Sequence, residues 1–174
     1  FAVNNKNMDN VKICNFLAVS ITTIFGLYAS SILKTVPCGK DVMTKFYRNF
    51  VHLEPFHLLG NLLGLYSLTR VETALGTKKF IKLISFLIIF NTIFESVLHK
   101  VRPDTKCSIG FSGVLFGLIT WERIYYKKFD IPAILSLIFM IAMPSFTISN
   151  ASLSGHIIGS IGGIISGLLW AKFN

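Results

Sequence analysis

The feature that most constrains this chain is the stretch from residue 131 to residue 171, which contains no charged side chain. A helix needs only about 20 apolar residues to cross a bilayer, so this stretch is long enough for two crossings. Across the whole chain only 14% of the residues are charged and 52% are hydrophobic. A soluble domain usually carries about 25% charged residues. The sequence therefore predicts an all-α membrane protein rather than a cytosolic enzyme or a disulfide-stapled secreted module.

The apolar runs predict six helices. Pro144 and the polar residues 145–154 are expected to divide the uncharged stretch into the fifth and sixth helices. The first four helices are expected in the remaining apolar runs, which cover residues 13–33, 55–69, 83–99 and 107–121. The loops between these runs are mostly short, which leaves no room for a second, soluble domain.

The same pattern sets the domain boundaries. Residues 13–172 are expected to form one membrane domain of six transmembrane helices, with an N-terminal flank at 1–12 and a tail at 173–174. The chain begins with Phe1 rather than Met, which leaves open whether the natural N-terminus lies further upstream. We expect an integral, multi-pass protein in contact with the lipid bilayer, and the sequence does not identify which membrane holds it.

The net charge of +9 comes from Lys and Arg residues in short clusters between the apolar runs, as is typical of membrane-flanking loops. No basic stripe with interleaved aromatic residues is present, so we expect no nucleic-acid partner. The positive-inside rule slightly favours a cytosolic N-terminus, which places the odd-numbered loops on the opposite side.

The three cysteines form no CxxC motif, and their odd number predicts no disulfide framework. No metal and no cofactor are expected.

Polar side chains at the starts of three predicted helices are the candidate functional residues, because a polar group inside a membrane helix is costly and suggests function. His57 opens the second helix, Ser112 the fourth and His156 the sixth. Each follows an odd-numbered loop. If there are six helices, these loops share one side of the membrane, and the three side chains lie at similar depth.

Glycines spaced four apart predict that the fourth and sixth helices pack closely, since small residues let membrane helices approach each other. They are Gly113 and Gly117 in the fourth helix and Gly159, Gly163 and Gly167 in the sixth. Such packing would bring Ser112 and His156 within about 3 Å, the distance needed for proton transfer.

A serine hydroxyl becomes a good nucleophile when a base removes its proton, and His156 is able to act as that base for Ser112. No Asp or Glu lies near His156 in the sequence, so we predict a Ser–His dyad. Taken alone, a serine in a membrane helix more often bonds its own backbone, and a single histidine is more often an interhelical contact. The combination of spacing and helix order favours the chemical interpretation.

Acyl transfer also requires hydrogen-bond donors for the oxyanion that forms on the carbonyl oxygen. His57 and Asn61 are four residues apart and therefore share one face of the second helix. Together with the backbone N–H of Ser112, they are the predicted donors. Gly110 and Gly113 flank the serine and would let the backbone approach a substrate.

These residues resemble the motifs of the rhomboid family of intramembrane serine proteases. Residues 57–61 resemble the family's HxxxN motif, and residues 110–113 resemble its GxSG motif. His156, followed by Gly159 and Gly163, resembles its HxxGxxxG pattern in the last helix. Further matches are His52, which fits an extra loop histidine, and Glu72 with Gly76, which fit the acid and glycine that end the second helix.

The resemblance implies an intramembrane serine endopeptidase that cleaves transmembrane segments of single-pass or multi-pass membrane proteins. Ser112 would be the nucleophile, His156 the base, and Phe116 an aromatic residue stacked on that base. Tyr47–Arg48 is the nearest match to the family's Trp–Arg pair in the first loop. It lies too close to His57, so that role is not assigned. The alternatives are a catalytically inactive rhomboid-like protein that binds membrane clients and an unrelated small transporter or channel.

Overall fold

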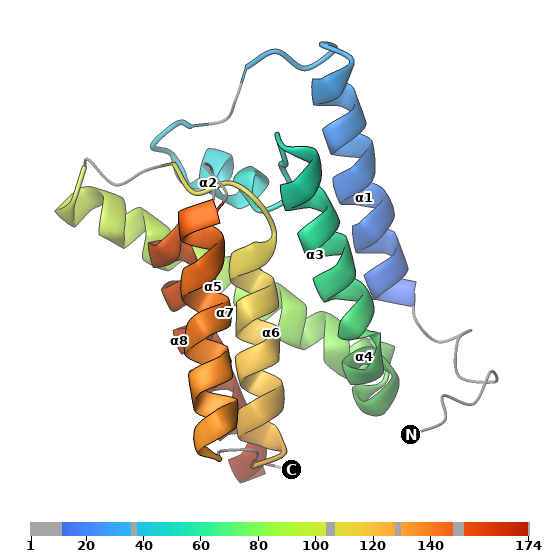
Figure 1. Cartoon of the computed structure of the whole chain (residues 1–174), viewed down its shortest axis with the longest axis vertical. Coiled ribbons are helices and arrows are strands. Elements are labelled where there is room, and N and C mark those ends of the chain that lie inside the picture. Colours follow the sequence, from blue (N-terminus) through green and yellow to red (C-terminus); the bar gives the residue numbers. More distant parts are fainter. Residues whose placement is uncertain (1–11, 36–37, 104–106, 128–129, 148–151, 174) are drawn as a thin grey trace.

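The computed structural model describes residues 12–35, 38–103, 107–127, 130–147 and 152–173, and every regular element in these ranges is a helix. The helices are α1 (Lys12–Ala29), α2 (Val42–Arg48), α3 (Pro55–Ser67), α4 (Thr69–Leu75), α5 (Thr77–Val101), α6 (Ser112–Tyr125), α7 (Ile131–Thr147) and α8 (Leu153–Phe173) (Figure 1). The prediction of an all-α protein is confirmed.

Six of these helices match the predicted ones in order, and α2 and α4 are short additions of 7 residues each. Among the described residues, three helices are long and apolar enough to cross a membrane, namely Lys12–Ala29, Thr77–Val101 and Leu153–Lys172. The helices α3 and α6 have only 13 and 14 residues, which is shorter than a full crossing. Length and composition therefore assign three spans, and the count of six is not confirmed by them.

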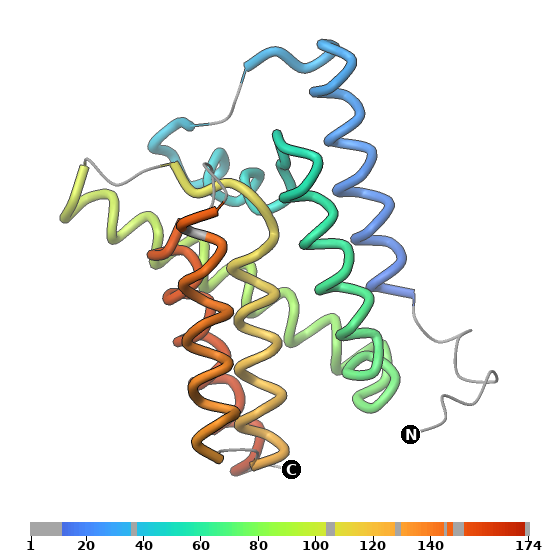
Figure 2. Tube along the Cα trace, in the orientation of Figure 1, coloured from blue at the N-terminus to red at the C-terminus, as the bar shows by residue number. Residues whose placement is uncertain are grey.

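The helices form two groups joined by α5 (Figure 1). On one side α6, α7 and α8 run side by side, on the other α1 lies beside α3, and α5 passes obliquely behind both groups. The apolar core lies between α1, α3, α5 and α6 and includes Leu17, Leu65, Leu87 and Trp121. Figure 2 shows that α3, α6 and α8 begin toward the same end of the molecule, close to α2.

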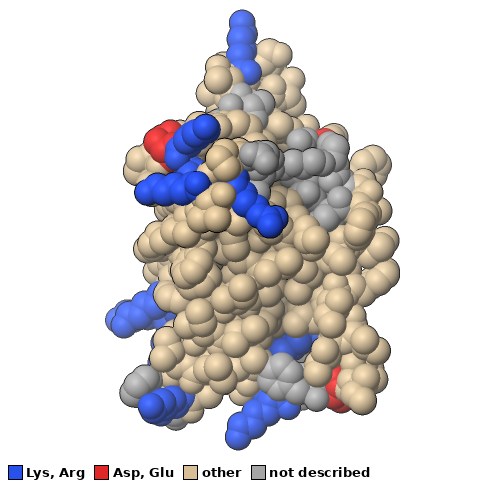
Figure 3. Space-filling view, turned by 90° about the vertical axis from the view of Figure 1, so that its left-hand side faces the viewer, with Lys and Arg blue, Asp and Glu red and all other residues tan. Residues whose placement is uncertain are grey.

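The outer surface is apolar where a bilayer would contact it. On the face shown in Figure 3, Lys and Arg side chains gather toward the two ends, and most of the surface between them is uncharged. The helix α7 contributes large exposed apolar side chains, among them Leu135, Ile138 and Phe139. An exposed apolar surface of this extent is characteristic of contact with lipid rather than with water.

The tightest helix pair is α6 with α8, and glycines make it possible. A methyl group at Gly159 would collide with the backbone carbonyl of Gly113, and one at Gly163 would collide with the carbonyl of Gly117. The two backbones therefore touch where side chains would otherwise keep them apart. The close approach predicted from the glycine spacing is present.

A buried carboxylate ties α4 to the start of α1. Glu72 is completely buried, and its two carboxylate oxygens accept hydrogen bonds of 2.9 Å from the backbone N–H groups of Ile13 and Cys14. The first N–H groups of a helix have no partner within the helix, and a negative charge is favoured there. These two hydrogen bonds hold α4 against the start of α1.

The uncharged stretch is divided into two helices, as expected, and the division falls within residues 145–154. The helix α7 continues through Pro144 to Thr147, and α8 begins at Leu153. A proline inside a helix removes one backbone hydrogen bond, and membrane helices often tolerate that loss. Only three residues of α7 follow the proline, so the helix ends within the polar stretch that was expected to separate the two helices.

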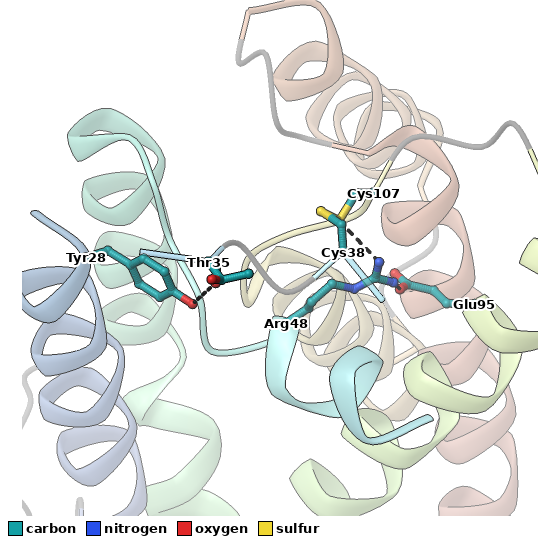
Figure 4. Close-up of a disulfide and its surroundings, with 6 residues drawn as sticks. All are labelled: Tyr28, Thr35, Cys38, Arg48, Glu95 and Cys107. Carbon is teal, nitrogen blue, oxygen red and sulfur yellow. Dashed lines mark hydrogen bonds and ion pairs between the residues drawn. A yellow bond between two sulfur atoms is a disulfide. The ribbon is translucent and has the colours of Figure 1, made fainter. Parts of the chain in front are cut away.

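The expectation that the three cysteines form no disulfide framework is wrong. Cys38, between α1 and α2, is bonded to Cys107, between α5 and α6, with a Cα–Cα distance of 5.7 Å (Figure 4). The two cysteines are 69 residues apart in the sequence, so only the fold brings them together. Cys14 is the odd cysteine, and it is buried within the core as a free thiol.

Candidate active site

The hydroxyl of Ser112 lies beside the imidazole of His156, with 2.9 Å between Oγ and Nε2. Ser112 is the first residue of α6, and His156 lies in the first turn of α8. His156 is 1% exposed, whereas Ser112 is partly exposed. The Gly113–Gly159 contact lies directly beside this pair and sets the distance between the two helices. The arrangement is a serine hydroxyl in hydrogen-bond contact with a buried base.

The other nitrogen of the same imidazole faces α7. Nδ1 of His156 lies 3.0 Å from the backbone carbonyl oxygen of Ile141. A carbonyl oxygen only accepts hydrogen bonds, so Nδ1 carries the proton in the neutral imidazole. Nε2 is then unprotonated and accepts the hydrogen bond from the Ser112 hydroxyl. This is the tautomer that a general base next to a serine requires.

Gly110 allows the chain to turn tightly before Ser112. Its φ angle is 111°, in the region that favours glycine. A Cβ atom at this position would lie 2.6 Å from Cε1 and 2.8 Å from Nε2 of His57. The backbone before the serine and the imidazole of His57 are therefore in direct contact, and only a glycine leaves room for both.

His57 and Asn61 are buried in α3, each 3% exposed, and the His57 imidazole faces the serine turn. Asn61 donates one hydrogen bond to the backbone carbonyl of His57 at 2.8 Å. Neither ring nitrogen of His57 has a hydrogen-bond partner among the described residues, nor does Oδ1 of Asn61. Buried polar atoms are usually paired. An unpaired imidazole beside the serine is suited to receive a polar group of a ligand.

His52, in the loop before α3, is fully buried next to the same turn. Its Nε2 accepts a hydrogen bond of 3.4 Å from the backbone N–H of Phe111, the residue before Ser112. Its ring lies edge-on to that of His57, with 5.1 Å between the centroids. Burial and the nearby His57 imidazole lower the pKa of His52 to about 4. His52 is therefore neutral at pH 7, as an accepting Nε2 requires.

Phe116 lies one turn after Ser112 and contacts His156, with 4.6 Å between the ring centroids. The ring planes are inclined by 49°, so the contact is tilted rather than stacked in parallel. The structure thus gathers Ser112, His156, His57, Gly110, Gly113, Phe116 and His52 around one turn. Asn61 lies one helical turn after His57 in α3 and bonds its carbonyl oxygen.

The sequence assigned no role to Arg48 and did not indicate the carbonyl of Ile141. Arg48 is 1% exposed and forms a buried ion pair of 3.0 Å with Glu95 of α5. The one signal for such a pair was an acidic residue within an apolar helix, which usually indicates a buried cation nearby. A backbone carbonyl leaves no such signal in a sequence.

The fold and the site together define an apolar helical bundle with a buried Ser–His pair near one end. A family model for the rhomboid domain matches residues 40–173. The chain is also 35% identical over 132 residues to a protein named as a rhomboid protein, L523 of Acanthamoeba polyphaga mimivirus. That match covers 73% of this chain and 74% of the viral protein. The chain therefore belongs to the rhomboid family and is an integral, multi-pass membrane protein.

Two plant proteins are more distantly similar. Rhomboid-like protein 15 of Arabidopsis thaliana is 23% identical over 168 residues, which cover 85% of this chain and 42% of that protein. Rhomboid-like protein 14, mitochondrial, of the same plant is 26% identical over 149 residues, which cover 76% of this chain and 43% of that protein. The chain thus matches less than half the length of either plant relative.

Proposed function

We propose that this protein is an intramembrane serine endopeptidase that cleaves transmembrane segments of other membrane proteins. The observation that carries the proposal is the 2.9 Å contact between Ser112 Oγ and His156 Nε2, with the protonated Nδ1 of His156 directed at Ile141. Membership of the rhomboid family supports it, because members of that family are usually intramembrane serine proteases.

In the proposed acylation step, Ser112 Oγ attacks the carbonyl carbon of the scissile peptide bond while His156 Nε2 takes the hydroxyl proton. The tetrahedral intermediate then collapses, the C–N bond breaks, and the proton on Nε2 passes to the leaving amine. A water molecule then attacks the resulting ester while His156 Nε2 takes one of its protons. The C–O bond to Ser112 breaks, and that proton passes to Ser112 Oγ. Throughout these steps the Ile141 carbonyl oxygen accepts a hydrogen bond from the Nδ1–H group of His156 and stabilises the imidazolium that forms.

The negative charge on the carbonyl oxygen needs donors that are already in place. We assign this role to the His57 side chain, the second N–H of the Asn61 amide and the backbone N–H of Ser112. The unpaired ring nitrogens of His57 support the assignment, because a buried donor without a partner stabilises an arriving oxyanion at little cost. Gly110 keeps the space in front of His57 free.

We further propose that all six longer helices are embedded in the bilayer and that α7 moves to admit the substrate. Short helices such as α3 and α6 fit a locally thinned bilayer, and flanking basic residues extend to the headgroups. The helix α7 packs mainly on α8 and exposes most of its apolar side chains. Because α7 packs against the rest of the protein on one side only, it is suited to move aside and open a lateral path for the substrate.

A fluorophosphonate probe tests the proposal, because it phosphonylates serines that an adjacent base activates. We expect the purified protein to be labelled at Ser112 and the Ser112→Ala variant to remain unlabelled. Ser166→Ala is the matched control, since Ser166 is also buried but bonds the carbonyl of Gly162 in its own helix. Intact client binding without any Ser112 labelling would instead support the inactive, client-binding alternative.

A further inference from the structure

Arg48 is buried at the centre of a cluster that joins three separate parts of the chain (Figure 4). From α2, its Nη2 pairs with Glu95 Oε2 on α5 at 3.0 Å, and its Nη1 donates to Cys107 Sγ at 3.2 Å. Cys107 is in turn bonded to Cys38. The disulfide and the ion pair thus hold α2 and α5 to the segment that leads into α6.

A backbone hydrogen bond connects this cluster to the segment that carries Ser112. The N–H of Gly110 donates to the carbonyl oxygen of Arg48 at 3.0 Å. Gly110 is three residues after Cys107 and two before Ser112. The segment that leads to the serine is therefore fixed twice, once by the disulfide and once by Arg48.

The cluster also packs against the residue that precedes His156. The Ser108 hydroxyl hydrogen-bonds the Glu95 carboxylate. A Cβ atom at Gly155 would lie 2.6 Å from Ser108 Oγ and 3.1 Å from Glu95 Oε1. Gly155 directly precedes His156, so the Glu95–Ser108 pair packs against the start of the turn that carries the base. One cluster supports both members of the Ser112–His156 pair.

We propose that Arg48, Glu95 and the Cys38–Cys107 disulfide form a thiol-sensitive clamp that positions Ser112 against His156, so that reducing the disulfide slows the serine's chemistry. This proposal rests on the proposed function. Arg48 and Glu95 are positioning residues, because they contact the backbone on both sides of the pair and not the reacting atoms. Misplacement of a nucleophile by as little as 1 Å costs up to about a hundredfold in rate.

The reduction is a thiol–disulfide exchange. A thiolate of a small dithiol attacks one sulfur of the disulfide and forms a mixed disulfide, and its second thiol displaces the protein sulfur. Cys38 and Cys107 become two thiols, and the dithiol becomes a cyclic disulfide. Cys38 is exposed and Cys107 half-buried, so the reagent reaches the bond from outside. Both cysteines lie in odd-numbered loops, on the side that the positive-inside rule places away from the cytosol, where disulfides persist.

The experiment measures the rate and the final extent of fluorophosphonate labelling at Ser112 before and after treatment with dithiothreitol in detergent. Alkylation after denaturation monitors the state of the bond, with one cysteine modified in the oxidised protein and three in the reduced protein. The Cys38→Ser/Cys107→Ser variant should label slowly with or without the dithiol. The matched control is Cys14→Ala, which removes the free thiol and should keep the full response.

We expect reduction to slow labelling about tenfold or more while its final extent stays the same, and reoxidation to restore the rate. A slower rate at an unchanged extent distinguishes positioning from unfolding, which would lower the extent. An unchanged rate with three alkylated cysteines would overturn the clamp, and so would a fall in extent alone. If the oxidised protein were never labelled at Ser112, the proposed function would fail and the role of the clamp with it.

Discussion

The imidazole of His156 lies between two partners, with Nε2 2.9 Å from the Ser112 hydroxyl and Nδ1 3.0 Å from the Ile141 carbonyl. No carboxylate takes part in this arrangement among the described contacts of His156. The backbone of α7 provides the acceptor that orients the ring. The helix proposed to move for substrate entry therefore also orients the His156 ring.

The first prediction concerns that tautomer. The backbone carbonyl oxygen of Ile141 can only accept a hydrogen bond. Neutral His156 should therefore carry its proton on Nδ1 and leave Nε2 unprotonated. Nitrogen NMR of the histidine-labelled protein near neutral pH distinguishes the two nitrogens, and His156→Gln assigns the signals. A His156 ring protonated on Nε2 would contradict the geometry.

The second prediction concerns the serine turn. Gly110→Ala should abolish labelling at Ser112, because the new methyl group would occupy the space beside His57 and the backbone angle of 111° is strained for alanine. The strain alone should lower the unfolding free energy by about 1–3 kcal/mol. Gly60→Ala is the control, since a Cβ atom there meets no other atom within 4 Å. Equal effects of both substitutions on labelling would refute the assignment.

The third prediction follows from the pKa of His52. Its value is lowered from 6.5 in the unfolded chain to about 4 by burial. Between these two values the unfolded chain binds the extra proton, so the stabilisation is present above pH 6.5 and is lost as the pH falls toward 4. The loss should be on the order of 3 kcal/mol. Denaturant unfolding at several pH values should show it, and His52→Gln should flatten that part of the profile.

The fourth prediction compares two ion pairs. Arg48→Gln leaves the Glu95 charge buried and should lower the unfolding free energy by about 3–5 kcal/mol. Arg70→Gln removes the pair with Glu122, in which the Arg70 side chain is 65% exposed, and should cost less than about 1 kcal/mol. Unfolding in detergent measures both variants, and a reversed order would contradict the burial seen for Arg48.

The parts of the site that the sequence predicted are those encoded in local spacing. Glycines four apart predicted the α6–α8 contact, and helix order placed Ser112 and His156 at the same end. The HxxxN and GxSG patterns indicated His57, Asn61 and Gly110. The first two inferences depend on a regular period and on alternation across a membrane, and the last depends on resemblance to the motifs of the rhomboid family.

The parts that the sequence did not predict depend on how loops meet. The Cys38–Cys107 bond and the Arg48–Glu95 pair join segments 69 and 47 residues apart, and nothing local specifies either pairing. Ile141 acts through its backbone, which every residue has. Pro144 alone does not mark the end of α7, because a proline costs one hydrogen bond and does not by itself fix where a helix stops.

The most direct test of the central claim is a cleavage assay with the protein reconstituted in lipid vesicles together with a generic single-pass transmembrane substrate. We predict cleavage by the unmodified chain and its loss in both Ser112→Ala and His156→Ala, with Ser166→Ala and His99→Ala unaffected. Cleavage at an unchanged rate in either of the first two variants would contradict the proposed Ser–His chemistry.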